Sequence, residues 1–187
     1  VYGPAARPDM AIFRFIKWVM EGNKVQIFGD GKQVRDFTYI DDIVLGTIGA
    51  LKLKGFHKIN LGNNNPSSLS ELIYIIEKHT GRKAKMEFLP ALPEDMRSTR
   101  ADIGKAKELL DWQPRVTLDE GIKRTADWMK DNWEWVKETA EICADLGVKH
   151  NYTFNCSSNF THPQFPGYWN DVRWHKKVTS VIRREPT

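Results

Sequence analysis

The chain of 187 residues is long enough for one domain with a hydrophobic core, since 41% of its residues are hydrophobic. Its net charge of +4 comes from interspersed charges up to residue 136 and a basic segment over residues 173–187, with no helix-turn-helix, zinc-finger or RNA-recognition signature, so we expect no nucleic-acid partner. No apolar run approaches the ~20 residues that a membrane span needs, which excludes a membrane helix from the expected elements.

The N-terminal part predicts a helix, two short strands and a second helix. Apolar residues recur at helical spacing over residues 11–20, with Asp9 as the expected N-cap and Gly22 as the expected end. The segments KVQIF and VRDFTYI alternate as strands do, and the turn GDG lies between them. Asp41 or Asp42 then caps and anchors the next helix in this interpretation.

The middle of the chain predicts a strand, a helix and another strand. The segment HKINL is typical of a short strand, and the polar loop GNNNPSS follows it. Ser68 and Glu71 form a capping box for a helix that ends at Gly81. The segment AKMEFL is then expected to form a strand, followed by a loop punctuated by prolines.

The C-terminal part predicts two helices. One covers residues 101–110, and the other opens at Thr117 and Glu120 and runs to about Trp135. Helices and short strands alternate, which indicates the α/β class, but the strands are too few and too short for a complete doubly wound sheet.

Several chemical motifs are missing from the sequence. No glycine-rich dinucleotide-binding turn, phosphate-binding loop or nucleophile elbow follows any predicted strand. The five histidines are scattered singly, and Cys143 and Cys156 have no metal or disulfide spacing. We therefore expect no metal site, and the two cysteines favour a reducing, cytoplasmic location.

Four segments, in this order and spacing, carry a family resemblance: VYGPAARPDMAIFRF, VQIFGDGKQVRDFTYIDD, INLGNNNPSSLSELI and TRADIGKAKELLDWQPRVTLDEGIKRTADWM. Together they resemble the C-terminal half of extended short-chain dehydrogenases/reductases of the NAD-dependent epimerase/dehydratase family, which act on nucleotide sugars. The RPDMA form most resembles UDP-glucuronate 4-epimerases. The resemblance covers residues 1–135 and then fades.

The resemblance implies an α/β fold that is the substrate-binding portion of the family enzyme and lacks most of its Rossmann sheet. Residues 1–136 would bind the nucleotide sugar, and residues 137–187 would be a C-terminal extension of unknown role. The family's NAD-binding turn and its catalytic tyrosine and lysine precede the VYGP segment. Tyr2 is not that tyrosine, because Ala6 stands where the lysine would be. This chain alone would then hold no catalytic or NAD-binding residue and be inactive.

Arg35 is the central candidate for substrate binding. It matches the family arginine that binds the substrate diphosphate, and an arginine fork suits phosphate oxygens because its N–H groups are planar and permanently charged. From the residues alone, a surface ion pair with Asp36, Asp41 or Asp42 is the alternative.

The resemblance implies further contacts with a UDP-sugar. Asp95 matches an aspartate that accepts hydrogen bonds from the ribose hydroxyls. Phe28 lies on the strand beside the base and packs either on uracil or in the core. Ala11 and Phe37 are further implied binding residues.

Leu92 departs from the family pattern, because many relatives carry a second phosphate-binding arginine there. Arg97 and Arg100, in the same loop, are the candidates to substitute for it, and a solvated side chain is the favoured alternative for each.

The function implied by the resemblance is that of an NAD-dependent nucleotide-sugar 4-epimerase, an isomerase that is a homodimer when complete. The alternatives are 4,6-dehydration or decarboxylation on the same scaffold, a non-catalytic nucleotide-sugar-binding module, and nucleic-acid binding through the basic tail. Because the family's substrate lid packs on a nucleotide-binding domain, we also expect an exposed apolar surface, with the helix over residues 11–20 as its place.

Overall fold

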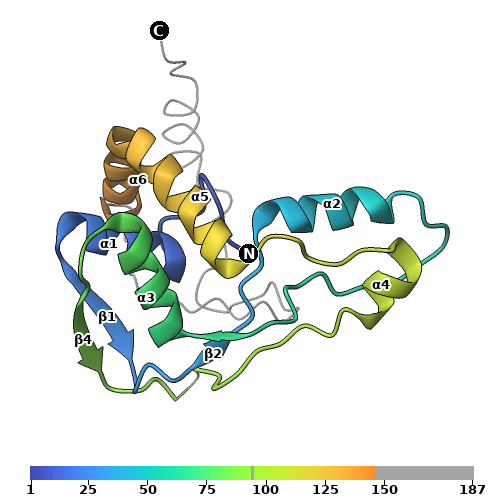
Figure 1. Ribbon diagram of the computed structural model, residues 1–187, viewed down its shortest axis with the longest axis horizontal. Coiled ribbons are helices and arrows are strands. Elements are labelled where there is room, and N and C mark those ends of the chain that lie inside the picture. The colour runs from blue at the N-terminus through green and yellow to red at the C-terminus, as the bar shows by residue number, and fades with distance from the viewer. Residues whose placement is uncertain (94, 146–187) are drawn as a thin grey trace, which may run out of the picture.

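The computed structural model describes residues 1–93 and 95–145, which form a main lobe and an arm (Figure 1). The main lobe consists of α1, β1, α3, β4, α5 and α6. The arm consists of α2, α4 and the segments that connect them to the lobe. The elements in chain order are α1 Ala11–Glu21, β1 Lys24–Phe28, β2 Val34–Arg35, α2 Ile40–Ala50, β3 Ser67–Ser68, α3 Leu69–Thr80, β4 Lys85–Leu89, α4 Gly104–Leu110, α5 Leu118–Asp131 and α6 Trp133–Asp145.

The main lobe encloses the larger hydrophobic core. β1 and β4 pair in parallel, from Lys24 opposite Lys85 to Phe28 opposite Leu89. Helix α1 buries its apolar side against this pair and against α3, and α3 packs on α5. Val136 of α6 is also fully buried in this core. The amphipathic pattern predicted for α1 is therefore confirmed, but that face is covered by the chain itself.

Local signals fix most helix ends in the main lobe. Ser68 Oγ accepts a hydrogen bond from the Glu71 backbone N–H at 3.1 Å, as predicted for the start of α3. Thr117 Oγ1 accepts from the Glu120 N–H at 3.2 Å at the start of α5. The predicted cap at Asp9 is wrong, because Met10 is the N-cap of α1 and Asp9 pairs with Arg7.

The predicted last helix is divided in the structure. Helix α5 ends at Asp131, and Asn132 leaves the helical conformation while its side chain donates to the Trp128 carbonyl at 2.9 Å. Helix α6 then crosses residue 136, the expected domain boundary. That boundary stays a prediction, and most of the segment 137–187 lies outside the described residues.

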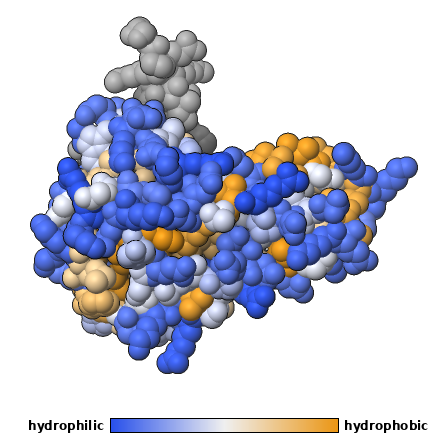
Figure 2. Space-filling model, viewed as in Figure 1, coloured by the Kyte–Doolittle hydropathy of each residue, from blue (hydrophilic) through white to orange (hydrophobic). Residues whose placement is uncertain are grey.

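The arm has a much smaller core, formed by Ile103, Ala106 and Trp112. Helix α2 covers it with one side and exposes large apolar residues on the other. The hydrophobic colour along the arm in Figure 2 marks this exposed row, which consists of Val44, Leu45, Ile48 and Leu51. The expectation that the exposed apolar surface lies on residues 11–20 is therefore wrong.

Two predicted strands are not formed as expected. The structure assigns no strand to residues 57–61, and the described part of the chain supplies no strand beside them. The strand predicted for VRDFTYI is shortened to Val34–Arg35, and two isolated bridges join this segment to other parts of the chain, Val34 with Ser98 and Tyr39 with Tyr2. Helix α4 begins at Gly104 rather than residue 101. No helix in the described part has the length and apolar character to cross a membrane.

Candidate functional site

The short strand β2 lies where the main lobe meets the arm (Figure 1). On one side Arg35 pairs with Ser67 of β3 in an antiparallel register. On the other side the Val34 N–H donates to the Arg97 carbonyl at 2.9 Å, and the Thr99 N–H donates to the Val34 carbonyl at 3.1 Å. The backbone around β2 is thus held from both sides, which limits the directions in which its side chains can point.

Arg35 forms an ion pair with Asp95, from its Nη2 to Asp95 Oδ1. The two side chains are 19% and 13% exposed, so the pair is largely screened from water but reaches the surface. Arg35 Nη1 also donates to the Val34 carbonyl at 2.9 Å. Asp95 follows a turn in which its own N–H donates to the Leu92 carbonyl at 3.0 Å. Both side chains are therefore held in place before any ligand arrives.

Gln33 completes this group, which we call the Arg35 cluster: Gln33, Arg35 and Asp95. Gln33 Nε2 donates to the Phe28 carbonyl and to Asp95 Oδ2, the latter at 3.3 Å. Gly29 leaves room for this side chain, since a Cβ there would lie 3.1 Å from Gln33 Nε2, and its φ of +76° favours glycine. The cluster therefore joins the end of β1 to β2 and to the loop after β4.

The Arg35 cluster is suited to an anionic group that carries hydroxyls. A guanidinium has five N–H donors. The hydrogen bonds of Arg35 to Asp95 and to the Val34 carbonyl occupy some of them. The others can bind phosphate oxygens with charge-assisted hydrogen bonds of roughly 1.5 to 3 kcal/mol each. Each carboxylate oxygen of Asp95 keeps a lone pair that can accept from a hydroxyl.

The alternative that Arg35 pairs with a neighbouring aspartate is wrong, because its partner is Asp95. Asp36 Oδ2 instead accepts from the backbone N–H groups of Asn64 and Ala101, at 3.1 and 2.8 Å. Asp36 therefore ties two arm segments to the strand that carries Arg35.

The two aspartates of α2 have different roles. Asp42 is buried and accepts from the backbone N–H groups of Arg115 and Val116, both at 3.0 Å. Its role as an anchor is confirmed, but the predicted cap is wrong: Tyr39 is the N-cap, without a side-chain bond. Asp41 forms an ion pair at the surface, with its Oδ2 at 3.5 Å from Arg124 Nη1.

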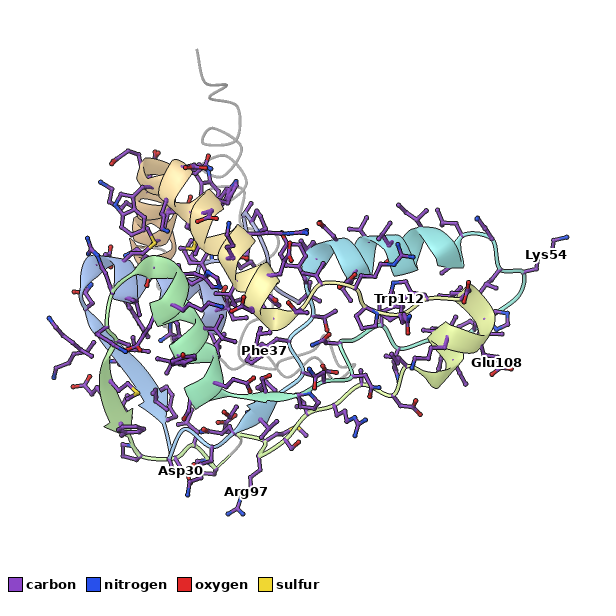
Figure 3. All side chains as sticks on the ribbon, viewed as in Figure 1. Asp30, Phe37, Lys54, Arg97, Glu108 and Trp112 are labelled. Carbon is purple, nitrogen blue, oxygen red and sulfur yellow. The ribbon has the colours of Figure 1, made fainter. Side chains whose placement is uncertain are left out.

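Of the other predicted site residues, one contacts the cluster directly, and the rest differ in their exposure. Phe28 ends β1 and touches the cluster through its carbonyl. Phe37 is partly buried against the main core, and Ala11 is the exposed first residue of α1. Arg97 points away from the body of the molecule (Figure 3). Arg100 donates to Asn64 Oδ1 at 2.9 Å.

Sequence reasoning missed Gln33 and Asp36. A strand alternates its faces, so Gln33 lies on the same face as Arg35, two residues later. That spacing was a usable signal for Gln33. The bonds of Asp36 join segments 28 and 65 residues away along the chain, and no local pattern announces such distant partners.

Two further features lie apart from the Arg35 cluster. Tyr2 is buried, its hydroxyl lies 3.5 Å from the Leu118 carbonyl, and burial raises its pKa well above the ordinary value for a phenol. A cavity of about 190 Å³ lies in the arm, with Leu45 and Trp112 among its lining residues. Among residues 1–93 and 95–145, no group of three or more histidine, cysteine or acidic side chains is placed to hold a metal ion.

Two family models match the chain. The model described as GDP-mannose 4,6 dehydratase matches residues 2–125. A second, described as sugar-binding cellulase-like, matches residues 83–183. The two overlap over residues 83–125, which include β4, paired with β1, and the first part of α5, which packs on α3. The rest of the second range extends past residue 145 into residues that the structure does not describe.

Named relatives are similar over about 70% of the chain. A UDP-glucuronate 4-epimerase of Thermodesulfobacterium geofontis is 55% identical over 138 residues, 73% of this chain and 43% of the relative. The crystal structure of UDP-glucuronic acid 4-epimerase from Bacillus cereus, in complex with UDP-glucuronic acid and NAD, is 42% identical with a TM-score of 0.67, over 70% of this chain and 43% of that one. A UDP-glucose 4-epimerase of Thermotoga maritima with UDP-glucose is 31% identical with a TM-score of 0.68, over 71% and 44%. The chain thus spans less than half of the length of these relatives.

Proposed function

Because the chain belongs to the NAD-dependent epimerase/dehydratase family, we propose that it is the C-terminal, substrate-binding portion of a nucleotide-sugar 4-epimerase of the UDP-glucuronate type. The observation that carries this proposal is the Arg35 cluster, in which a largely screened arginine and aspartate are held side by side. A cation for the diphosphate and an acceptor for the hydroxyls are the two groups that a nucleotide sugar needs.

Each predicted binding residue has a role in this proposal. Arg35 binds the diphosphate, and Asp95 keeps the guanidinium oriented while its free lone pairs accept from the ribose. Phe28 packs on the base. Ala11 and Phe37 line the sugar end of the site. With Leu92 in place of a second arginine, Arg35 carries most of the charge recognition.

Arg97 remains a candidate second phosphate ligand. Its side chain is exposed and directed away from the body of the molecule, so it would have to turn toward the cluster on binding (Figure 3). Arg100 is held by Asn64 in the ligand-free chain and would have to leave that partner. Arg97 is therefore the better placed of the two.

NAD is bound by relatives of this chain, including the Bacillus cereus epimerase, and supplies the oxidation and reduction of the sugar when present. The sequence has no glycine-rich dinucleotide-binding turn, so its residues do not fit the cofactor by themselves. We assign NAD binding to the remaining portion of a complete enzyme. This chain positions the nucleotide sugar, and alone it is inactive.

The exposed apolar surface of the arm is a second observation that supports the proposal. Val44, Leu45 and Ile48 of α2, together with Leu51 just after it, are exposed, and residues 57–61 have strand composition but no strand partner in the described part. An apolar helix face together with an unpaired segment of strand composition fits burial against a sheet and its helices. A nucleotide-binding portion of the same enzyme is the partner that this family membership favours. Dehydration or decarboxylation on the same scaffold would leave this binding role unchanged.

Calorimetric titration of the chain with UDP-glucuronic acid, UDP and free glucuronic acid tests the proposal. We expect UDP to retain most of the affinity of UDP-glucuronic acid, because the Arg35 cluster binds the nucleotide end, and free glucuronic acid to bind at least about tenfold more weakly than UDP. If UDP and UDP-glucuronic acid both fail to bind at millimolar concentration, the proposal is wrong.

A further inference from the structure

We infer that Gln33 is a specificity-determining residue of the substrate site, whose Oε1 accepts a hydrogen bond from a ribose hydroxyl of the bound nucleotide. The inference rests on the proposed function. It adds a residue outside the set expected from the family resemblance and names the part of the substrate that this residue contacts.

The orientation of the Gln33 side-chain amide is fixed by its surroundings. Its Nε2 faces two acceptors, the Phe28 carbonyl and Asp95 Oδ2. A flipped amide would direct Oε1 at these two oxygens, and neither can donate when Asp95 is ionised. The pairing with Phe28 and Asp95 therefore leaves Oε1 on the other side of the amide.

In that position Gln33 Oε1 is buried and has no hydrogen-bond partner among the described residues. A buried acceptor without a partner is unfavourable, because it has lost its hydrogen bond to water, so such an atom needs an explanation. Only a donor can satisfy it. A phosphate, which offers acceptors alone at neutral pH, cannot.

The position of Gln33 in the cluster favours a ribose hydroxyl as this donor. Nε2 and Oε1 share one carbon, and Nε2 donates to Asp95 Oδ2 at 3.3 Å, so Oε1 belongs to the same connected group of side chains as the Asp95 carboxylate. The cluster reaches the surface at Arg35 and Asp95. A nucleotide that places its diphosphate on Arg35 and one ribose hydroxyl on Asp95 brings its second hydroxyl to the neighbouring acceptor. Two acceptors in one cluster can receive the two adjacent donors of a cis-diol.

Oε1 is closed to solvent in the unliganded chain, so a ribose hydroxyl reaches it only when side chains of the cluster shift on binding, and it then replaces no water there. The hydrogen bond should then contribute to affinity more fully than one at an exposed acceptor. The site is expected to prefer ribonucleotides over deoxyribonucleotides, and to lose part of this preference without Gln33.

The test compares UDP with 2′-deoxy-UDP and 3′-deoxy-UDP on the native chain and on two variants. Gln33→Met removes both the donor and the acceptor at similar volume. Gln33→Lys keeps a donor for Phe28 and Asp95 and removes only the acceptor. The measured quantity is the ratio of dissociation constants between each deoxy analogue and UDP, in which effects common to all three ligands cancel.

We expect the ratio for one of the two analogues to fall about fivefold in both variants, the value of one neutral hydrogen bond. Gln113→Met, an exposed glutamine of the arm, is the matched control and should leave both ratios unchanged. Ratios that stay within twofold of the native values in Gln33→Lys overturn the inference. If Arg35→Ala still weakens UDP binding in that case, the proposed function stands and only the role of Gln33 is wrong.

Discussion

The main lobe and the arm differ in how completely they bury their apolar side chains. In the lobe, α1, α3 and α5 turn their apolar faces toward one another and toward β1. In the arm, three residues form the core, and α2 leaves a row of large apolar side chains exposed (Figure 2). The lobe thus covers the apolar faces of its own helices, whereas the arm leaves one apolar helix face uncovered. The Arg35 cluster lies at the junction of the two regions.

The largest effect on the free energy of unfolding should come from truncating a side chain in the core of the lobe. Phe13 is 1% exposed and lies in the main cluster. Phe13→Ala should lower the free energy of unfolding by about 3 to 5 kcal/mol, since it leaves a cavity in a packed core. Denaturant unfolding measures this. Ile103→Ala, in the core of the arm, is the comparison, and an equal loss there would remove the distinction between the two regions.

A smaller effect is expected from the charges between α3 and α5. Lys78 and His79 both contact Asp119 Oδ1, at 2.7 and 3.1 Å. The bond from Lys78, and then that from His79, lowers the pKa of Asp119 below its ordinary value. A lowered folded-state pKa gives a contribution that is present above the ordinary aspartate pKa and is lost as the pH falls through the lowered one.

Thermal melting between pH 6 and pH 2.5 checks this contribution. Native protein should lose slightly more stability on acidification than Asp119→Asn, by about 0.5 kcal/mol or less because the pair is half exposed. Identical pH profiles for the two proteins would show that this contact adds nothing to the lobe.

The smallest effect on stability is expected on the exposed side of α2. Ile48 is 53% exposed, so Ile48→Lys should change the free energy of unfolding by less than about 0.5 kcal/mol and reduce the binding of a hydrophobic dye. Ile16→Lys, at a fully buried position of α1, should prevent folding. If both substitutions destabilise the chain equally, the outer face of α2 is part of a core and the comparison fails.

The features predicted well from sequence depend on local contacts. The start of α3 at Ser68 and its end at Gly81 follow from bonds within one helical turn. Strands β1 and β4 formed where they were expected, because each has a partner in the same lobe. Residues 57–61 have strand composition but no partner strand in the described part, and composition alone cannot supply one.

Only part of the site could be predicted, because its contacts also depend on residues that are distant in the sequence. Arg35 and Asp95 were both named from the family resemblance, but their direct ion pair joins residues 60 positions apart and no spacing rule indicates it. The exposed apolar face was assigned to α1, because periodicity shows that a helix has an apolar side but not what covers it. In the structure α3 and β1 cover α1, and α2 is left exposed.

The central claim, that Arg35 serves ligand binding rather than the fold, is tested most directly by measuring UDP affinity and unliganded melting together for Arg35→Ala, Arg35→Lys and Arg100→Ala. We predict that Arg35→Ala weakens UDP binding by roughly 2 to 4 kcal/mol, about 30-fold to 1000-fold, with lysine restoring only part and Arg100→Ala changing little. The stability of the unliganded chain should fall by less than about 1 kcal/mol, since Asp95 keeps its bond from Gln33. If Arg35→Ala instead lowers the melting temperature sharply and leaves UDP affinity within a factor of about two, Arg35 is a structural ion-pair residue and the account is contradicted.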